Sequence, residues 1–222
     1  MAGLWVDQFD RDGAVEDAFE RLPAPTRRAF LAALAGIAGA GVVGVGRADA
    51  AGLAKSDRAI LNFALTLEYL QASFYTEAER AGALHGPVKV QARVVGSHER
   101  AHVEALRSAL GSSAPAEPKF NFKGVTESRA AFVRTAVGFE DLAVAAYKAQ
   151  LPEIRARGVL ASALAIHSVE ARHAAWIRRL AGVVPAADAF DKAESMAEVA
   201  KVVSSTHFVV STTSRAKPRV TG

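Results

Sequence analysis

A Glu-x-x-His motif that occurs twice in this 222-residue chain limits the possible folds more than any other feature. Glu99 precedes His102, and Glu170 precedes His173, 71 residues further along the chain. Residues three apart on an α-helix project from one face, so each pair presents a carboxylate and an imidazole together. Apolar residues share those faces, which predicts that both pairs point into the core of a helical protein. Charged groups placed there need a compensating partner.

Two further glutamates repeat with nearly the same spacing. Glu68 and Glu140 lie 72 residues apart, and each interrupts an apolar helical face about thirty residues before one of the motifs. The repeat therefore covers a pair of helices, and four helices direct a carboxylate inward. Interhelical salt bridges with Arg or Lys are the alternative, but three of the four faces carry no basic residue beside the acid. We therefore expect metal cations as the compensating charge.

The predicted ligands are four carboxylates and two imidazoles, from Glu68, Glu99, His102, Glu140, Glu170 and His173. Two divalent cations carry four positive charges, which cancel four carboxylates while both imidazoles stay neutral. Carboxylate oxygen combined with imidazole nitrogen suits iron or manganese, with zinc as a further occupant. The sequence thus predicts two metal ions per chain, Fe or Mn, held between four helices.

Several segments around these residues are similar to a known family. They are residues 61–75, 99–103 and 169–173, together with Phe139-Glu140-Asp141 and Ala189-Phe190-Asp191. They resemble the bacterial ferritin-like proteins related to plant desiccation-related proteins, over roughly residues 55–203. The resemblance implies an all-α fold, a ferritin-like four-helix bundle in which all six ligand positions are filled. It does not define a reaction.

The four predicted bundle helices and a short C-terminal helix follow from apolar periodicity and stop signals. They span residues 56–81, 87–110, 126–152, 153 or 157 to 181, and 195–203. Ser56 and Asp57 are predicted to cap the first helix, and Gly158 is a candidate kink in the fourth. We expect the chain beyond residue 204 to be loosely ordered.

A long crossover is predicted between helices two and three, over residues 112–123. Pro115 and Pro118 exclude a continuous helix there. Phe120 and Phe122 are expected to hold the crossover against the core. A ferritin-like topology requires such a connection, because it must cross the bundle.

The first fifty residues are predicted to lie outside the bundle. Arg27-Arg28 precedes a Gly- and Ala-rich apolar run that ends at Val45, and Ala48-Asp49-Ala50 offers small residues for cleavage. This pattern resembles a twin-arginine export signal. A retained membrane anchor is the alternative, although a run of about 17 residues is short for a span. The predicted divisions are a signal peptide over 1–50, the bundle over 51–184 and a C-terminal extension over 185–222.

Composition narrows the chemistry and the partners. The chain contains no Cys, which excludes thiolate metal sites and disulfides. Its basic residues are scattered over several helices without interleaved aromatic residues, so we expect no nucleic-acid partner. We also expect no stable membrane span after cleavage, and a periplasmic, cell-surface or extracellular location. The oligomeric state is open, with a dimer as one option.

Two tyrosines are predicted to lie around the metal ligands. Tyr75 and Tyr147 each follow an inward glutamate by seven residues, two helical turns on the same face. Each can hydrogen-bond a carboxylate from the other half of the bundle and offer a nearby electron, and ordinary core packing is the alternative. His98 and His167 lie beside the ligand faces, where an outer or surface role is expected over direct ligation.

These features together indicate an exported protein with a carboxylate-bridged dinuclear iron or manganese centre. Such a centre favours redox chemistry with oxygen or peroxide, as a ferroxidase, a peroxidase or a catalase-like enzyme. The alternative is a non-enzymatic metal-binding protein that protects against desiccation or other stress. A DNA-binding mini-ferritin is disfavoured, because export would separate it from DNA.

Overall fold

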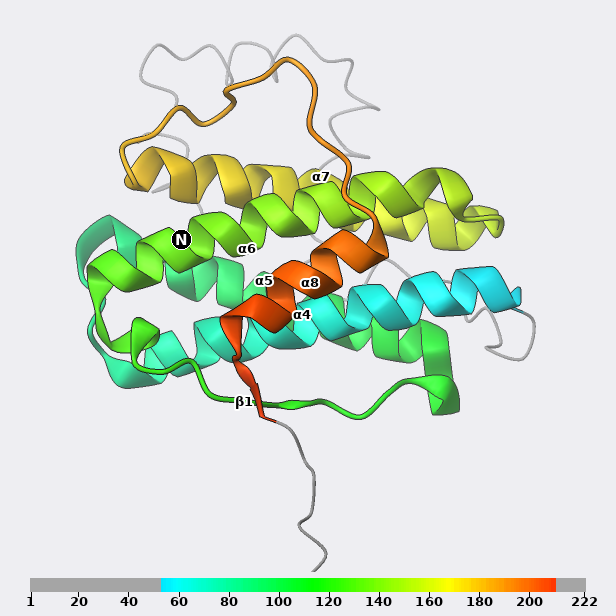
Figure 1. Ribbon diagram of the computed structural model, residues 1–222, viewed down its shortest axis with the longest axis horizontal. Coiled ribbons are helices and arrows are strands. Elements are labelled where there is room, and N and C mark those ends of the chain that lie inside the picture. Colours follow the sequence, from blue (N-terminus) through cyan, green and yellow to red (C-terminus); the bar gives the residue numbers. More distant parts are fainter. Residues whose placement is uncertain (1–52, 211–222) are drawn as a thin grey trace, which may run out of the picture. The chain divides into compact units, whose positions relative to one another are not determined.

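The structure is a computed structural model that describes residues 53–210. The predicted export signal over 1–50 and the tail over 211–222 lie outside the described residues. Within them, four long helices lie side by side and a shorter helix follows (Figure 1). They are α4 (Lys55–Ala81), α5 (Gly86–Leu110), α6 (Arg129–Gln150), α7 (Arg157–Leu180) and α8 (Met196–Thr206). The predicted all-α fold with a four-helix bundle is confirmed.

The bundle consists of two helical hairpins. α4 packs along α5, which gives the N-terminal hairpin, and α6 packs along α7, which gives the C-terminal hairpin. Between the hairpins, α5 faces α7 and α4 faces α6 less extensively. The α4–α6 side is covered by α8, whose fully buried Val199 packs with Leu67 of α4 and Ala146 of α6. Among residues 53–210, no helix is both long and apolar enough to cross a membrane.

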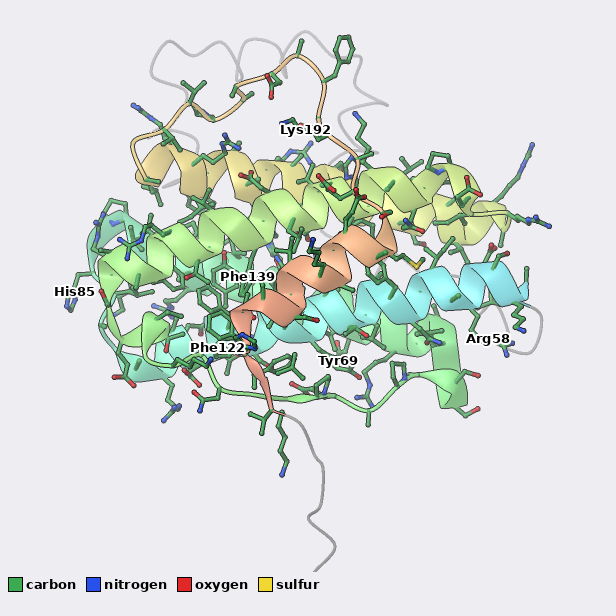
Figure 2. All side chains as sticks on the ribbon, in the orientation of Figure 1. Arg58, Tyr69, His85, Phe122, Phe139 and Lys192 are labelled. Carbon is green, nitrogen blue, oxygen red and sulfur yellow. The ribbon has the colours of Figure 1, made fainter. Side chains whose placement is uncertain are left out.

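The crossover between α5 and α6 runs along the outside of the bundle (Figure 1), and a buried aromatic side chain near its end holds it against the core. It contains the 3-10 helices η2 (Gly111–Ser113) and η3 (Val125–Glu127) and the short strand β1 (Lys119–Phe120). Phe122, labelled in Figure 2, is 2% exposed and packs edge-on against Phe74 of α4, as the sequence predicted. Phe120 is only partly buried.

The chain after residue 204 is more ordered than predicted. α8 continues to Thr206, and strand β2 (Val209–Val210) pairs antiparallel with β1. Between them, Phe208 is buried against Phe122 and Phe139, and its carbonyl accepts a hydrogen bond from the backbone N–H of Asn121. Burial of Phe208 therefore anchors the chain at least to residue 210.

The predicted cap of the first helix is wrong. α4 begins after Ala54, and neither Ser56 nor Asp57 caps it. Asp57 is fully buried, and its carboxylate accepts hydrogen bonds from the backbone N–H groups of Arg155 (3.1 Å) and Ala156 (2.8 Å). Those residues directly precede α7, so Asp57 supplies negative charge to the N-terminus of the last bundle helix. It joins the two hairpins at one end of the bundle.

The starts of two other helices can be compared with the predicted ones. α6 begins at Arg129 rather than at residue 126, because Ser128 accepts a hydrogen bond from the N–H of Ala131 and the preceding residues form η3. α7 begins at Arg157, the later of the two predicted starts, after the 3-10 helix η4 (Leu151–Glu153). Gly158 therefore lies in the first turn of α7, where it cannot kink the helix.

Candidate metal centre

Six buried or nearly buried side chains meet between the two hairpins, and they are the six predicted from the repeated motif. α4 contributes one carboxylate, α6 contributes one, and α5 and α7 each contribute a carboxylate and an imidazole: Glu68, Glu140, Glu99 with His102, and Glu170 with His173. All four glutamates are 0% exposed. A bundle core with four buried carboxylates is stable only if cations or protons compensate them.

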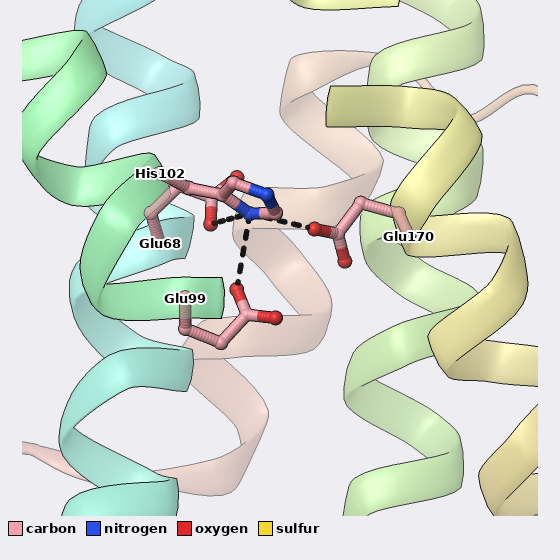
Figure 3. Close-up of side chains that lie close together, drawn as sticks. All are labelled: Glu68, Glu99, His102 and Glu170. Atoms are coloured by element: carbon pink, nitrogen blue, oxygen red, sulfur yellow. Dashed lines mark hydrogen bonds and ion pairs between the residues drawn. The ribbon is translucent and has the colours of Figure 1, made fainter. Parts of the chain in front are cut away.

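The first group of atoms surrounds Nδ1 of His102 (Figure 3). This nitrogen lies 3.0 Å from Glu170 Oε1, 3.3 Å from Glu68 Oε2 and 3.7 Å from Glu99 Oε2. The three carboxylates come from three different helices. The side chain of His102 is 12% exposed, so this group lies close to the surface.

The second group surrounds Nδ1 of His173 and shares two residues with the first. This nitrogen lies 3.0 Å from Glu99 Oε1, 3.5 Å from Glu140 Oε2 and 3.7 Å from Glu170 Oε2. Glu99 and Glu170 thus direct one oxygen toward each imidazole. A carboxylate in that position can bridge two neighbouring cations.

The atoms that face one another in these groups are poorly hydrogen-bonded. Both carboxylate oxygens of Glu99 and of Glu170, Oε2 of Glu140 and Nδ1 of His173 are buried without a hydrogen bond of acceptable geometry. Buried polar atoms without partners are costly, and native structures rarely tolerate several together. In each group, the ligand atoms lie within 4.8 Å of one another, as ligands of one ion must. Oxygen and imidazole donors of this kind fit a divalent iron, manganese or zinc ion.

The electrostatics of the metal-free site place protons on both imidazoles. Burial opposes protonation of His173, but Glu140, Glu170 and Glu99 raise its pKa to about 12. Burial likewise opposes protonation of His102, yet the facing carboxylates raise its pKa far above the ordinary range. Each nitrogen must lose its proton before it can bind a metal. Metal binding should therefore release protons.

The carboxylates divide into groups with raised and lowered pKa values. Burial, with Glu170 and Glu68 nearby, raises the pKa of Glu99 well above its usual range. Burial also raises the pKa of Glu140 to about 7. Burial acts in the same direction on Glu170, but the two facing imidazoles outweigh it and lower its pKa to about 2. In the metal-free protein, some of these carboxylates therefore hold protons and others are ionised. A pair of bound cations would replace the protons.

Glu68 and Glu140 each belong to only one ligand group, and a tyrosine hydroxyl binds the carboxylate oxygen of each that does not face an imidazole. Tyr75 of α4 donates a hydrogen bond to Oε1 of Glu140, and Tyr147 of α6 donates one to Oε1 of Glu68 at 2.6 Å. Both bonds cross from one hairpin to the other, as the sequence predicted. Burial, followed by the adjacent carboxylate, raises the pKa of each phenol, so both stay protonated donors.

One buried polar residue near the site was not predicted from the sequence, and for two histidines only an outer or surface role was predicted. Gln91 is fully buried on α5, and its Nε2 donates to the hydroxyl of Tyr75 at 3.5 Å. Its position, eight residues before Glu99 on the same helical face, was the available signal. His98 contacts His173 rather than a carboxylate, and burial followed by the neighbouring imidazoles lowers its pKa. His167 belongs to neither group of ligand atoms.

A family model described as a ferritin-like domain matches residues 56–183, more than half of the chain. The matched span runs from the first turn of α4 to just beyond α7 and contains all six converging side chains. No curated protein is similar enough to the chain to be matched with it.

Proposed function

The chain belongs to the ferritin-like domain family, and from that premise we propose that it binds two iron or manganese ions in a carboxylate-bridged centre. The supporting observation is that Glu99 and Glu170 divide their oxygens between the two ligand groups. One ion would be completed by Glu68 and His102, and the other by Glu140 and His173. Zinc is a further occupant that the same donors accept.

We propose redox chemistry with oxygen or peroxide at this centre, as a ferroxidase, a peroxidase or a catalase-like enzyme. A pair of adjacent iron or manganese ions, when bound, supplies electrons to such small oxidants. The chain's own residues bind and orient the ions, and Tyr75 and Tyr147 hold Glu140 and Glu68 while each offers a nearby phenol. Full burial of the carboxylates favours substrates as small as these oxidants.

An anaerobic titration tests this proposal. Fe(II) or Mn(II) is added to the metal-free protein, then oxygen or peroxide, while absorbance and dissolved gas are followed. We expect about two ions per chain and oxidation above the protein-free rate. Glu99→Gln should abolish both, whereas Glu104→Gln, an exposed position on the same helix, should change neither. Failure of the protein to bind either metal would overturn the centre.

A non-enzymatic role in protection against desiccation or other stress is the second candidate. It is favoured by the same complete burial of the four carboxylates, since a closed centre can stabilise the bundle without reacting. Two bound ions that never accelerate oxidation of Fe(II) or consumption of peroxide would select this role.

Export by the twin-arginine pathway is also proposed, on the sequence pattern of residues 26–50. That pathway carries folded proteins, so the ions could be bound before export. Replacing both Arg27 and Arg28 with Lys should keep the precursor inside the cell. Unchanged export of that double variant, measured by fractionation, would overturn this part of the proposal.

A further inference from the structure

His98 makes a direct contact with one of the two imidazoles in the proposed centre. Its Nδ1 lies 2.9 Å from Nε2 of His173, and the two rings are nearly parallel, with centroids 5.1 Å apart and planes inclined by 19°. His98 is on α5 and His173 is on α7, so the contact joins the two hairpins. Overall His98 is exposed, whereas His173 is 3% exposed. The pair therefore runs from the buried carboxylates to the surface.

The positions of the ring nitrogens determine where the hydrogen atoms lie. Nδ1 of His173 faces three carboxylates, and it must be free of hydrogen to bind a metal. The hydrogen of the neutral ring is then on Nε2, which donates to Nδ1 of His98. His98 accepts with its own hydrogen on Nε2, toward solvent. An outer partner of this kind selects the tautomer of a ligand histidine and holds the ring orientation.

The other imidazole lacks such support. His102 has hydrogen-bond and ion-pair partners only at Nδ1, and its Nε2 contacts no polar group in the described part of the chain. The two ligand groups therefore share the same donors but differ in how firmly their imidazole is held.

We propose that His98 is a positioning residue that keeps Nδ1 of His173 directed at Glu140, Glu99 and Glu170. This inference rests on the proposed metal centre and adds to it a difference between the two ions. His98 strengthens binding of the ion held by His173 and leaves the ion held by His102 nearly unaffected.

Calorimetric titration of the metal-free full-length protein with Zn(II), which is redox-inert, tests the proposal. His98→Ala should weaken one of two binding steps by roughly 10- to 100-fold, the range typical of outer partners of ligand histidines. His98→Asn keeps an acceptor near the position of Nδ1 and should restore most of the affinity. His167→Ala removes a histidine on α7 that belongs to neither ligand group, and should leave both steps unchanged.

Two further measurements assign the weakened step. In a Glu68→Ala background, where the His173 ion is expected to remain, His98→Ala should weaken binding, whereas in a Glu140→Ala background it should have no effect. In the zinc-loaded protein, the Nε2–H resonance of His173 should be protected from solvent exchange, and protection should be lost in His98→Ala and retained in His98→Asn. A merely structural role would not produce this pattern.

The outcomes separate this inference from the function on which it rests. Two zinc ions bound equally well by the unmodified protein and by His98→Ala would overturn the role of His98 and leave the metal centre intact. Equal weakening of both steps, or no rescue by His98→Asn, would also overturn it. Absence of zinc binding in the unmodified protein would overturn the centre, and this inference with it.

Discussion

The N-terminal and C-terminal hairpins carry the same ligands but surround them differently. In the C-terminal hairpin, His173 is supported from outside by His98, whereas His102 of the N-terminal hairpin has no such partner among the described residues. Conversely, Tyr75 accepts a hydrogen bond from Gln91, whereas among the described residues the hydroxyl of Tyr147 is bonded only to Glu68. The repeat therefore reproduces the ligands, and the two halves differ in the residues that hold those ligands.

The side chains that contact a ligand directly come from the opposite hairpin. Tyr75 reaches Glu140, Tyr147 reaches Glu68, and His98 reaches His173, each from the opposite hairpin. Neither hairpin can thus orient its own ligands alone. We expect the two metal positions to be unequal in affinity, and substitutions of the ligands and of their supports test this difference.

The largest loss of metal affinity should come from substitution of a carboxylate that belongs to both ligand groups. Glu99→Ala should lower the affinity for both ions by more than about 100-fold, beyond the range typical of outer partners, because both of its oxygens face ligand positions. Glu68→Ala should weaken only the ion at His102. Metal analysis after equilibrium dialysis measures both variants, and equal loss of the two ions in Glu68→Ala would contradict the division into two groups.

The metal-free protein should lose stability as pH rises. The pKa of Glu140 is raised from 4.5 to about 7. Its contribution to the free energy of unfolding is therefore complete below pH 4.5 and is lost as pH rises through 7. The pKa of His173, raised to about 12, extends the loss above pH 6.5. The pKa of Glu170 is lowered to about 2, so its contribution to stability is lost as pH falls below 4.5 and does not change between pH 5 and pH 8. The melting temperature with chelator should fall by about 10 °C between pH 5 and pH 8.

Circular dichroism melts of the metal-free protein at both pH values measure this change. Glu140→Gln should reduce the difference, since the substituted amide does not titrate, while the exposed control Glu104→Gln should retain it. Bound metal should raise the melting temperature by linkage, most strongly at the higher pH, where fewer protons compete. Greater stability of the metal-free protein at pH 8 than at pH 5 would contradict the charge distribution described above.

The smallest effect should separate the two tyrosines. Tyr75→Phe removes the hydrogen-bond partner of Oε1 of Glu140 and of Nε2 of Gln91, whereas Tyr147→Phe removes only that of Oε1 of Glu68. Each should destabilise the protein by about 1–3 kcal/mol, with Tyr75→Phe costing about 1 kcal/mol more in urea unfolding. Both should keep near-normal metal content and alter oxidation kinetics.

Substitution of Gln91 is the control for the difference in stability between Tyr75→Phe and Tyr147→Phe. A Tyr75→Phe, Gln91→Leu double variant removes the donor that the single substitution leaves unpaired, so its stability should return toward that of Tyr147→Phe. Equal destabilisation by the two single variants, with no recovery in the double variant, would show that Gln91 does not distinguish the hairpins.

The sequence predicted the bundle and the convergence of six side chains because both follow from periodicity. A carboxylate at position 68 and another at position 140 interrupt apolar faces, and that signal is local. The contacts of Asp57 and His98 could not be predicted in the same way, because they depend on distant parts of the chain. Asp57 contacts a residue 99 positions away, and His98 contacts one 75 positions away. Asp57 lies near the start of a helix and therefore resembled an ordinary cap. Its burial is explained by its contact with the residues that precede α7.

The short ribbon of β1 and β2 was missed for a related reason. Two-residue strands carry no alternating pattern, and their pairing depends on where the crossover and the end of α8 are brought together. Phe208 is the residue that could have indicated it, because a large aromatic side chain in a Ser- and Thr-rich tail needs a place to be buried.

The bond from Asp57 to the start of α7 also bears on the order in which the chain can fold. The carboxylate and the two N–H groups that it accepts from are separated by 98 and 99 residues, so Asp57 meets its partners only after most of the bundle has been synthesised. A nascent chain that has formed only the N-terminal hairpin would carry Asp57 without its partners. We therefore expect the hairpins to fold and unfold together, with the slow closure of this long loop as a late event.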